Sequence, residues 1–201
     1  MSSRDAILAA VRQHPLEPTP LPTLNQDWIQ YPDLVAQFSA VIQTVGGSCI
    51  PVSSENEINA HLKELPQFAS ATVRCSTVEG IGEPTLDAGS VEKPHDLLPV
   101  DFAVLRGEFC VAENGAVWIT DEPTPHRAVY FITQHLALVV ARSQIVSNMH
   151  EAYQRLSFDG PRFGAFISGP SKTADIEQSL VIGAQGARSL VVFLVDDVTG
   201  T

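Results

Sequence analysis

The chain has 201 residues, a length typical of one domain with a small appendage, and 44% of its residues are hydrophobic, which argues against disorder. Its 12 lysines and arginines stand against 23 aspartates and glutamates, a formal net charge of -11. An acidic chain of this kind repels phosphate backbones and anionic lipid surfaces, so we expect no nucleic-acid partner and no membrane insertion.

The N-terminal segment predicts a helix followed by a connector. Residues 3–13 carry apolar side chains at helical spacing, and the prolines of residues 14–22 exclude both helix and central strand there. We therefore expect residues 1–22 to form an appendage and residues 23–201 to form one α/β domain. The helix could dock on a partner, on a second copy of the chain to form a homo-oligomer, or back on its own domain.

From residue 33 onward, the apolar pattern alternates between helical and strand periods. Asn114-Gly115 between two apolar runs predicts a hairpin, and the Gly- and Pro-rich residues 79–99 predict a long loop. The whole pattern predicts a three-layer α/β/α fold with a mostly parallel, partly mixed sheet. The expected helices are 33–45, 54–65, 143–156 and 173–182, and the expected strands are 48–52, 71–75, 102–105, 109–112, 116–120, 128–133, 136–141, 163–167 and 190–195.

The cysteines Cys49, Cys75 and Cys110 are odd in number and widely spaced, without a C-x-x-C motif. This spacing argues against a disulfide framework, a zinc site and an iron–sulfur site, and favours buried thiols. The start of the chain lacks the apolar stretch of a signal peptide, and no apolar run approaches the length of a membrane span. We therefore expect a cytoplasmic protein.

The sharpest motif is Phe166–Glu177, in which an apolar strand leads through Gly169-Pro170-Ser171 into the helix expected from Thr173. The first-turn N–H groups of such a helix bind carboxylates or phosphates, and open α/β sheets bind ligands at the carboxyl edge where this turn is expected. An ordinary capped turn is the structural alternative. The predicted ligand-binding residues are Asn114, Gly115, Gly169, Pro170, Ser171, Thr173, Asp175 and Glu177.

Two side chains are candidate catalytic residues. Glu113 stands at a strand end, where a carboxylate can act as base or nucleophile, although the spacing alone favours a solvated turn residue. His135 lies between two β runs. The other histidines show no metal-binding spacing, so no metal site is predicted.

The segments Cys110–Val117 and Phe166–Glu177, with Gly183 and Gly186 beyond them, resemble the LUD-domain family, in its lactate utilisation protein C (YkgG-like) group. The resemblance covers about residues 100–195 and implies a fold like the NagB/RpiA/CoA-transferase group. It also implies a role in oxidising L-lactate to pyruvate, with iron–sulfur clusters in partner subunits and none in this chain. At Gln185-Gly186-Ala187 the chain departs from the His-Gly-Pro common in the family.

Three functions remain open at this point. The chain could be a non-cluster component of a lactate-oxidising system that binds a small carboxylate or a partner at the turn from Gly169 to Glu177. It could be a free-standing enzyme of the sugar-phosphate isomerase or CoA-transferase type that uses Glu113 and binds phosphate at the helix start. It could also be a regulatory or scaffold module.

Overall fold

The computed structural model describes residues 2–13, 19–24, 26–122, 124, 126–157, 159–160, 163–173 and 181–197. Its centre is a five-stranded parallel sheet in the order β1-β11-β6-β3-β2. After their first residues, His135 and Ser189, the two longest strands are continuous apolar runs that are buried on both faces, as central strands of a parallel sheet are. The five strands are β1 (Ser48–Val52), β2 (Arg74–Ser76), β3 (Phe102–Arg106), β6 (His135–Ala141) and β11 (Ser189–Val195).

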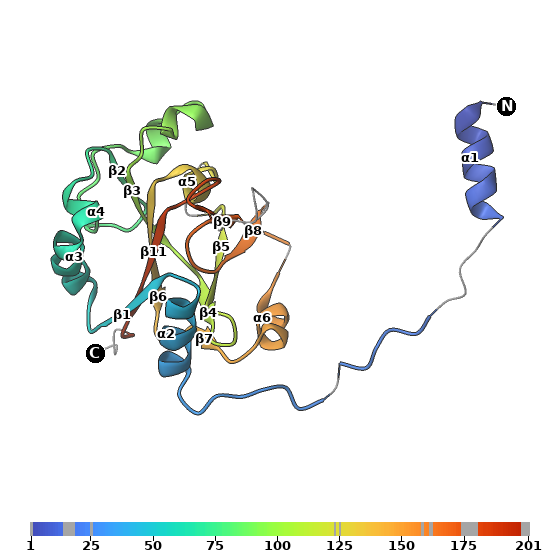
Figure 1. The fold of residues 1–201 in the computed structure, drawn as a ribbon, viewed down its shortest axis with the longest axis horizontal. Helices are drawn as coiled ribbons and strands as arrows, with labels where there is room; N and C mark the ends of the chain where they lie inside the picture. The colour runs from blue at the N-terminus through green and yellow to red at the C-terminus, as the bar shows by residue number, and fades with distance from the viewer. Residues whose placement is uncertain are drawn as a thin grey trace.

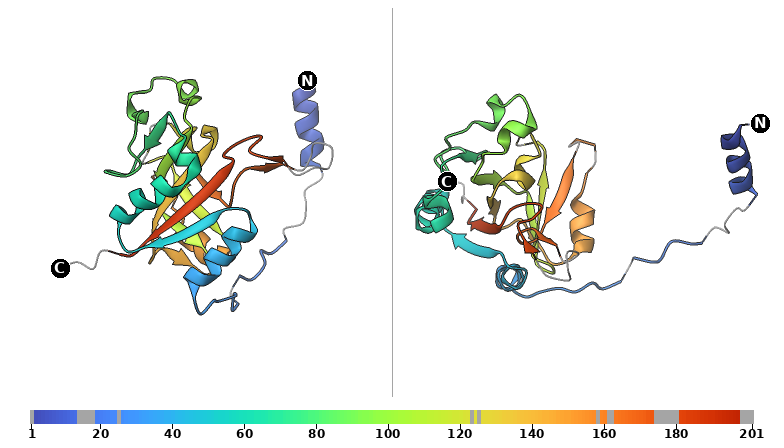
Figure 2. Two further views of the ribbon diagram at one scale, coloured as in Figure 1. Left: turned by 60° about the vertical axis from the view of Figure 1, so that its left-hand side comes forward. Right: turned by 45° about the horizontal axis from the view of Figure 1, so that its top comes forward.

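Helices α3 (Glu55–Glu64) and α4 (Pro66–Ala69) cover one face of this sheet (Figure 1). Ile58, Leu62 and Phe68 of these helices are buried in one cluster with side chains of β3, β6 and β11. Figure 2 shows β1 and β11 running side by side. Helices α3 and α4 cover the face of the sheet toward which His135 points. Phe102 packs in the same cluster as these helices and also stacks on the His135 ring.

A second, four-stranded sheet packs on the other face of the parallel sheet, in the order β7-β4-β5-β8. It comprises β4 (Phe109–Val111), β5 (Ala116–Thr120), β7 (Ile145–Val146) and β8 (Gly164–Ile167). The core between the two sheets also takes in side chains of α2 (Leu34–Thr44) and α5 (Val129–Ile132). Helix α6 (Met149–Arg155) covers the outer face of the second sheet, where Ala152 packs with Trp118.

The predicted α/β fold with a mostly parallel sheet covered by helices is confirmed. The antiparallel strands, which were expected to make this sheet mixed, form the separate four-stranded sheet. The predicted strand over 128–133 is wrong, because these residues form the short helix α5, whose Val129 and Tyr130 are buried. The predicted helix over 143–156 begins instead as β7 and becomes helical only at Met149. The loop over 79–99 contains two 3-10 turns, η1 (Ala88–Ser90) and η2 (Pro94–Leu97).

The predicted N-terminal helix is present as α1 (Ser3–Arg12) and buries none of its residues. It lies apart from the α/β body in Figures 1 and 2, and its side chains Ile7 and Val11 are 63% and 64% exposed. The chain joins the body at Trp28, whose ring stacks on His150 with centroids 3.3 Å apart. Among the residues that the structure describes, no helix is long and apolar enough to cross a membrane.

Candidate functional site

The two motif segments of the sequence meet in the second sheet. The Asn114-Gly115 turn joins β4 to β5 as a hairpin, and β8 pairs antiparallel with β5, so the end of β8 lies beside the start of β5. The hydroxyl of Ser168, directly after β8, donates a hydrogen bond of 2.8 Å to the Asn114 carbonyl. Glu113–Gly115 and the turn Gly169–Ser171 are therefore neighbours in space.

Two glycines with positive φ allow both turns to pack against α2. Gly169 has φ of 73°, and a Cβ placed on it would lie 2.4 Å from the Val45 carbonyl oxygen. Gly115 has φ of 66°, and its Cβ would lie 3.1 Å from the Ile42 backbone nitrogen. A left-handed backbone and a close approach each favour glycine, so both positions require it for conformational reasons.

The turn cavity, of about 280 Å³, lies between Ser168–Lys172 and Gln185–Ala187 and is closed by Tyr130, Phe131 and Leu136. Gly169, Pro170 and Ser171, three of the predicted ligand-binding residues, line it. Lys172 brings a positive charge to its rim, where the ammonium group donates a hydrogen bond to the Val45 carbonyl at the end of α2. The cavity is thus small and mixed in polarity, and residues with a hydroxyl and an ammonium group are among those that line it.

The turn cavity lies at a different edge of the parallel sheet from the one expected. Strand β8 belongs to the second sheet, and the cavity borders Leu136 and Leu190, which are the second residues of β6 and β11. The cavity therefore lies at the amino edge of the parallel strands. The expectation of a carboxyl-edge site was wrong, because the strand before the motif does not join the parallel sheet.

The helix expected from Thr173 to residue 182 is wrong at both ends. Lys172–Thr173 (β9) pairs antiparallel with Val181–Ile182 (β10). The Ser171 N–H donates to the Ala187 carbonyl and the Gly183 N–H donates to the Ser171 carbonyl, so the main chain folds back on itself here. β-branched Thr173, Val181 and Ile182 suit this paired backbone. Asp175 and Glu177, the other predicted ligand-binding residues, lie outside the described residues.

Asn114, Gly115 and Thr173 do not line the turn cavity. The Asn114 side-chain oxygen accepts from the Ala116 N–H at 3.1 Å, which shapes the hairpin turn. Thr173 is held in the β9–β10 pair opposite Val181. These residues support the walls of the cavity without facing into it.

The Glu113 side chain is exposed and is hydrogen-bonded to the first residue of helix α6. Its Oε2 accepts a hydrogen bond of 2.9 Å from the Met149 N–H, the first residue of α6, and its own N–H donates to the Ser147 carbonyl at 3.0 Å. A carboxylate at this position compensates the N–H groups and the positive dipole end of a helix. The residue therefore has a structural role in this conformation, and it is not among the side chains lining the turn cavity.

His135 is separated from Glu113 and faces a different cavity. It is the first residue of β6, and its Nδ1 lies 2.8 Å from the Ser189 hydroxyl. Burial, and then the positive charge of Arg188, lower the pKa of His135, while Asp101 opposes the shift. We call this cavity, of about 410 Å³, the polar basin; it is lined by Gln67, Ser70, Ala71, Leu98, Pro99, Asp101, Gln134, His135 and Arg188.

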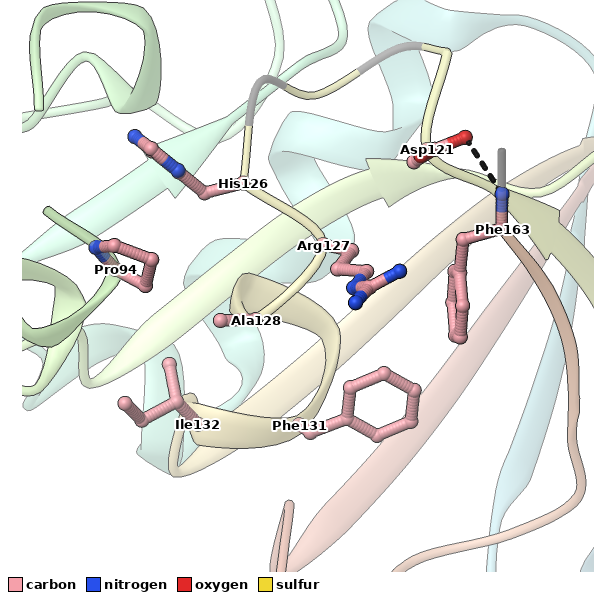
Figure 3. Close-up of a pocket in the computed structure, with 8 residues that line it drawn as sticks. All are labelled: Pro94, Asp121, His126, Arg127, Ala128, Phe131, Ile132 and Phe163. Carbon is pink, nitrogen blue, oxygen red and sulfur yellow. Dashed lines mark hydrogen bonds between the residues drawn. The ribbon is translucent and has the colours of Figure 1, made fainter. Parts of the chain in front are cut away.

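A third cavity, of about 670 Å³, was not signalled by any motif (Figure 3). We call it the aromatic cavity. The Arg127 guanidinium lies 5.0 Å from the centroid of the Phe163 ring, and Phe131 meets that ring edge-on at 6.1 Å. The Asp121 carboxylate accepts from the Phe163 N–H at 3.2 Å. Phe131 also borders the turn cavity, so the two cavities are neighbours.

The sequence also matches a known protein family. The model of the LUD domain family matches residues 87–195, more than half of the chain. The chain belongs to the LUD domain family. The matched region contains β3 to β8 and β11, the turn cavity and both candidate catalytic residues.

Curated relatives of this LUD protein carry a common name. Lactate utilization protein C of Bacillus pumilus (strain SAFR-032) is 33% identical over 102 residues, which cover 48% of this chain and 42% of the relative. Lactate utilization protein C of Shouchella clausii (strain KSM-K16) is 31% identical over 102 residues, 48% of this chain and 44% of the relative. The matched segment thus spans less than half the length of these relatives.

A solved structure shares the LUD fold. The crystal structure of a DUF162 family protein from Deinococcus radiodurans superposes with a TM-score of 0.57 at 19% identity, covering 81% of this chain and 96% of that chain. At this identity the likeness concerns the fold alone. It extends over most of the α/β body described above.

Proposed function

We propose that this LUD protein is a component of an L-lactate utilisation system and binds a small carboxylate, or a segment of a partner protein, at the turn from Gly169 to Glu177. The family and the shared name of its relatives support the system. The turn cavity supports the binding role, and it is the observation that carries the proposal: the family-like residues Gly169, Pro170 and Ser171 line one small cavity.

The chemistry of the turn cavity suits a small anion. Ser171 and Lys172 belong to the lining of the cavity, and their hydroxyl and ammonium groups can both donate hydrogen bonds to a carboxylate. The lining also contains the apolar side chains of Phe131 and Leu136, which suit the carbon end of a small acid. Phosphate is the other anion of matching size, and it lacks the apolar end.

We propose further that iron–sulfur partner subunits accept the electrons. Oxidation of lactate to pyruvate releases two electrons and two protons, and the thiols of this chain are poorly placed to hold a cluster. Cys75 and Cys110 are fully buried, and burial raises the pKa of both thiols, which disfavours the thiolates that clusters require. Iron and acid-labile sulfide near stoichiometry in the purified chain would contradict this part of the proposal.

The hydrogen bonding of Glu113 argues against a free-standing enzyme of the isomerase or CoA-transferase type. A nucleophile or base must reach its substrate, whereas the Glu113 carboxylate is bound to the Met149 N–H. The component role therefore has the better support.

The experiment is affinity capture of the tagged chain from L-lactate-grown cells, followed by L-lactate-dependent dye reduction in the eluate. We expect activity in the eluate and none in the chain alone. A matched capture with Ser171→Ala tests the turn cavity, and D-lactate tests selectivity. Dye reduction by the chain alone would overturn the component role, and an eluate without activity would overturn the lactate system.

A further inference from the structure

The polar basin is built by the register of three neighbouring parallel strands. His135 lies opposite Phe102 of β3 and opposite Ser189 of β11. The residues immediately before these three strands, Asp101, Gln134 and Arg188, therefore lie side by side at one edge. Main-chain hydrogen bonds hold them there, because the His135 N–H donates to the Asp101 carbonyl at 2.9 Å and the Arg188 N–H donates to the Gln134 carbonyl at 2.8 Å.

His135 lines the basin, and its two ring nitrogens differ in their surroundings. Its Nδ1 is engaged by the Ser189 hydroxyl, and its ring stacks on Phe102 with centroids 6.3 Å apart. Within the described part of the chain, Nε2 has no hydrogen-bond partner. Whether Nε2 donates or accepts depends on the tautomer, and a ligand hydroxyl can satisfy either role because it both donates and accepts.

Arg188 brings an available positive charge. A Cβ on Gly183, whose φ is 78°, would lie 2.3 Å from the Arg188 Cγ, so the loop is shaped around the stem of this side chain. No carboxylate of the described residues lies within ion-pair distance of its guanidinium group. The neighbouring Asp101 carboxylate instead accepts from the Thr72 and Val73 N–H groups at 2.8 and 2.9 Å.

We infer that the polar basin is a second ligand site, which binds a small hydroxylated monocarboxylate with the carboxylate on Arg188 and the hydroxyl on His135 Nε2. A guanidinium group binds a carboxylate through two parallel hydrogen bonds. Asp101 keeps a negative charge in the basin and therefore disfavours phosphate and dicarboxylates, which carry more charge.

This site is separate from the turn cavity on which the proposed function rests. Successive residues of a strand point to opposite faces, so His135 faces the basin whereas Leu136 faces the turn cavity. Each cavity can therefore be tested without altering the other.

The test is an NMR titration of the full chain with L-lactate, propionate and glycerol as probes. We expect L-lactate to shift the His135 ring signals saturably. Propionate lacks the hydroxyl and should bind several-fold more weakly, the loss expected for one neutral hydrogen bond. Glycerol lacks the carboxylate and should bind about tenfold more weakly or worse, the loss expected for a hydrogen bond to a charged group. Arg188→Gln should weaken L-lactate binding at His135 by a similar factor, whereas Lys63→Gln, at an exposed lysine of α3 outside both cavities, should leave it unchanged.

Three results would overturn the inference. The first is an absence of saturable shifts at His135, and the second is equal binding of L-lactate and propionate. The third is an Arg188→Gln chain that folds and binds as the unmodified chain does. Shifts confined to the Ser171 and Gly186 amides would overturn the basin site and support the turn cavity, so the two proposals fail separately. If the Arg188→Gln variant does not fold, the comparison of L-lactate, propionate and glycerol on the unmodified chain still tests whether the polar basin requires both the carboxylate and the hydroxyl.

Discussion

The Ser168 hydroxyl donates a 2.8 Å hydrogen bond to the carbonyl of Asn114, 54 positions earlier in the chain. This bond joins the turn after β8 to the hairpin turn between β4 and β5. It brings together two segments that carry the family resemblance. The turn cavity therefore rests on a tertiary contact as well as on local turn geometry.

Replacing Ser168 by alanine should loosen this contact. Because the side chain is exposed, we expect a modest loss of about 0.5–1.5 kcal/mol in the free energy of unfolding, the usual net value of one hydrogen bond. Ser168→Thr keeps the hydroxyl and is the matched control. Urea denaturation measures both variants, and equal stability of Ala and Thr at this position would show that the bond contributes nothing.

Gly169→Ala should destabilise the chain through two separate effects. The residue has φ of 73°, and the new methyl group would lie 2.4 Å from the Val45 carbonyl oxygen. Gly80 has nearly the same φ, 72°, but nothing lies within 4 Å of its Cβ position. Gly80→Ala should therefore lower the free energy of unfolding only by the strain of the left-handed backbone, about 1 kcal/mol. Gly169→Ala should lower it clearly more, because the methyl group also meets the Val45 carbonyl. Similar losses in chemical denaturation would contradict the close packing of the turn on α2.

Glu113→Ala should destabilise the start of α6, because the Met149 N–H loses its acceptor. We expect a loss of about 0.5–2 kcal/mol, as for other helix-capping side chains. Glu113→Gln retains an acceptor oxygen and should lose less than the alanine variant. Thermal unfolding compares the two. If Glu113→Gln instead abolished lactate-dependent activity at unchanged stability, Glu113 would be a catalytic residue.

The stability of the chain should depend on pH through His135. Burial, followed by the charge of Arg188, lowers the pKa of His135 from 6.5, so the unfolded chain binds a proton more readily than the folded one. This contribution to stability is complete above about pH 6.5 and is lost as the pH falls below that value. His135→Gln should flatten the pH dependence in this range. The same variant at about pH 8, where histidine is neutral, reports the packing effect alone. If the free energy of unfolding of His135→Gln depended on pH as that of the unmodified chain does, the lowered pKa of His135 would be contradicted.

The architecture was largely readable from the sequence for identifiable reasons. Leu136–Ala141 and Leu190–Val195 are unbroken apolar runs, which is how parallel strands buried on both faces read. Asn114-Gly115 supplies the positive φ that a tight hairpin needs. In contrast, the Val129–Ile132 segment has strand-like residues and yet forms helix α5, because burial of Val129 and Tyr130 between the sheets outweighs local propensity.

Only part of the candidate site could be predicted from the sequence. The glycines of both turns are local signals, and they led to the turn cavity. The sequence does not specify which sheet a strand joins, and so the edge of the cavity was predicted wrongly. The polar basin depends on the register of β3, β6 and β11, which places Asp101, Gln134 and Arg188 together although they are distant in sequence. The aromatic cavity depends in the same way on the tertiary contact of Phe131 with Phe163.

The most direct test of the central claim is growth of the source organism on L-lactate as sole carbon source after deletion of the gene for this chain. We predict that the deletion strain fails to grow on L-lactate, grows normally on pyruvate, and recovers when the unmodified chain is supplied. Undiminished growth of the deletion strain on L-lactate would contradict a role in lactate utilisation, and equal loss of growth on pyruvate would place the role elsewhere in metabolism.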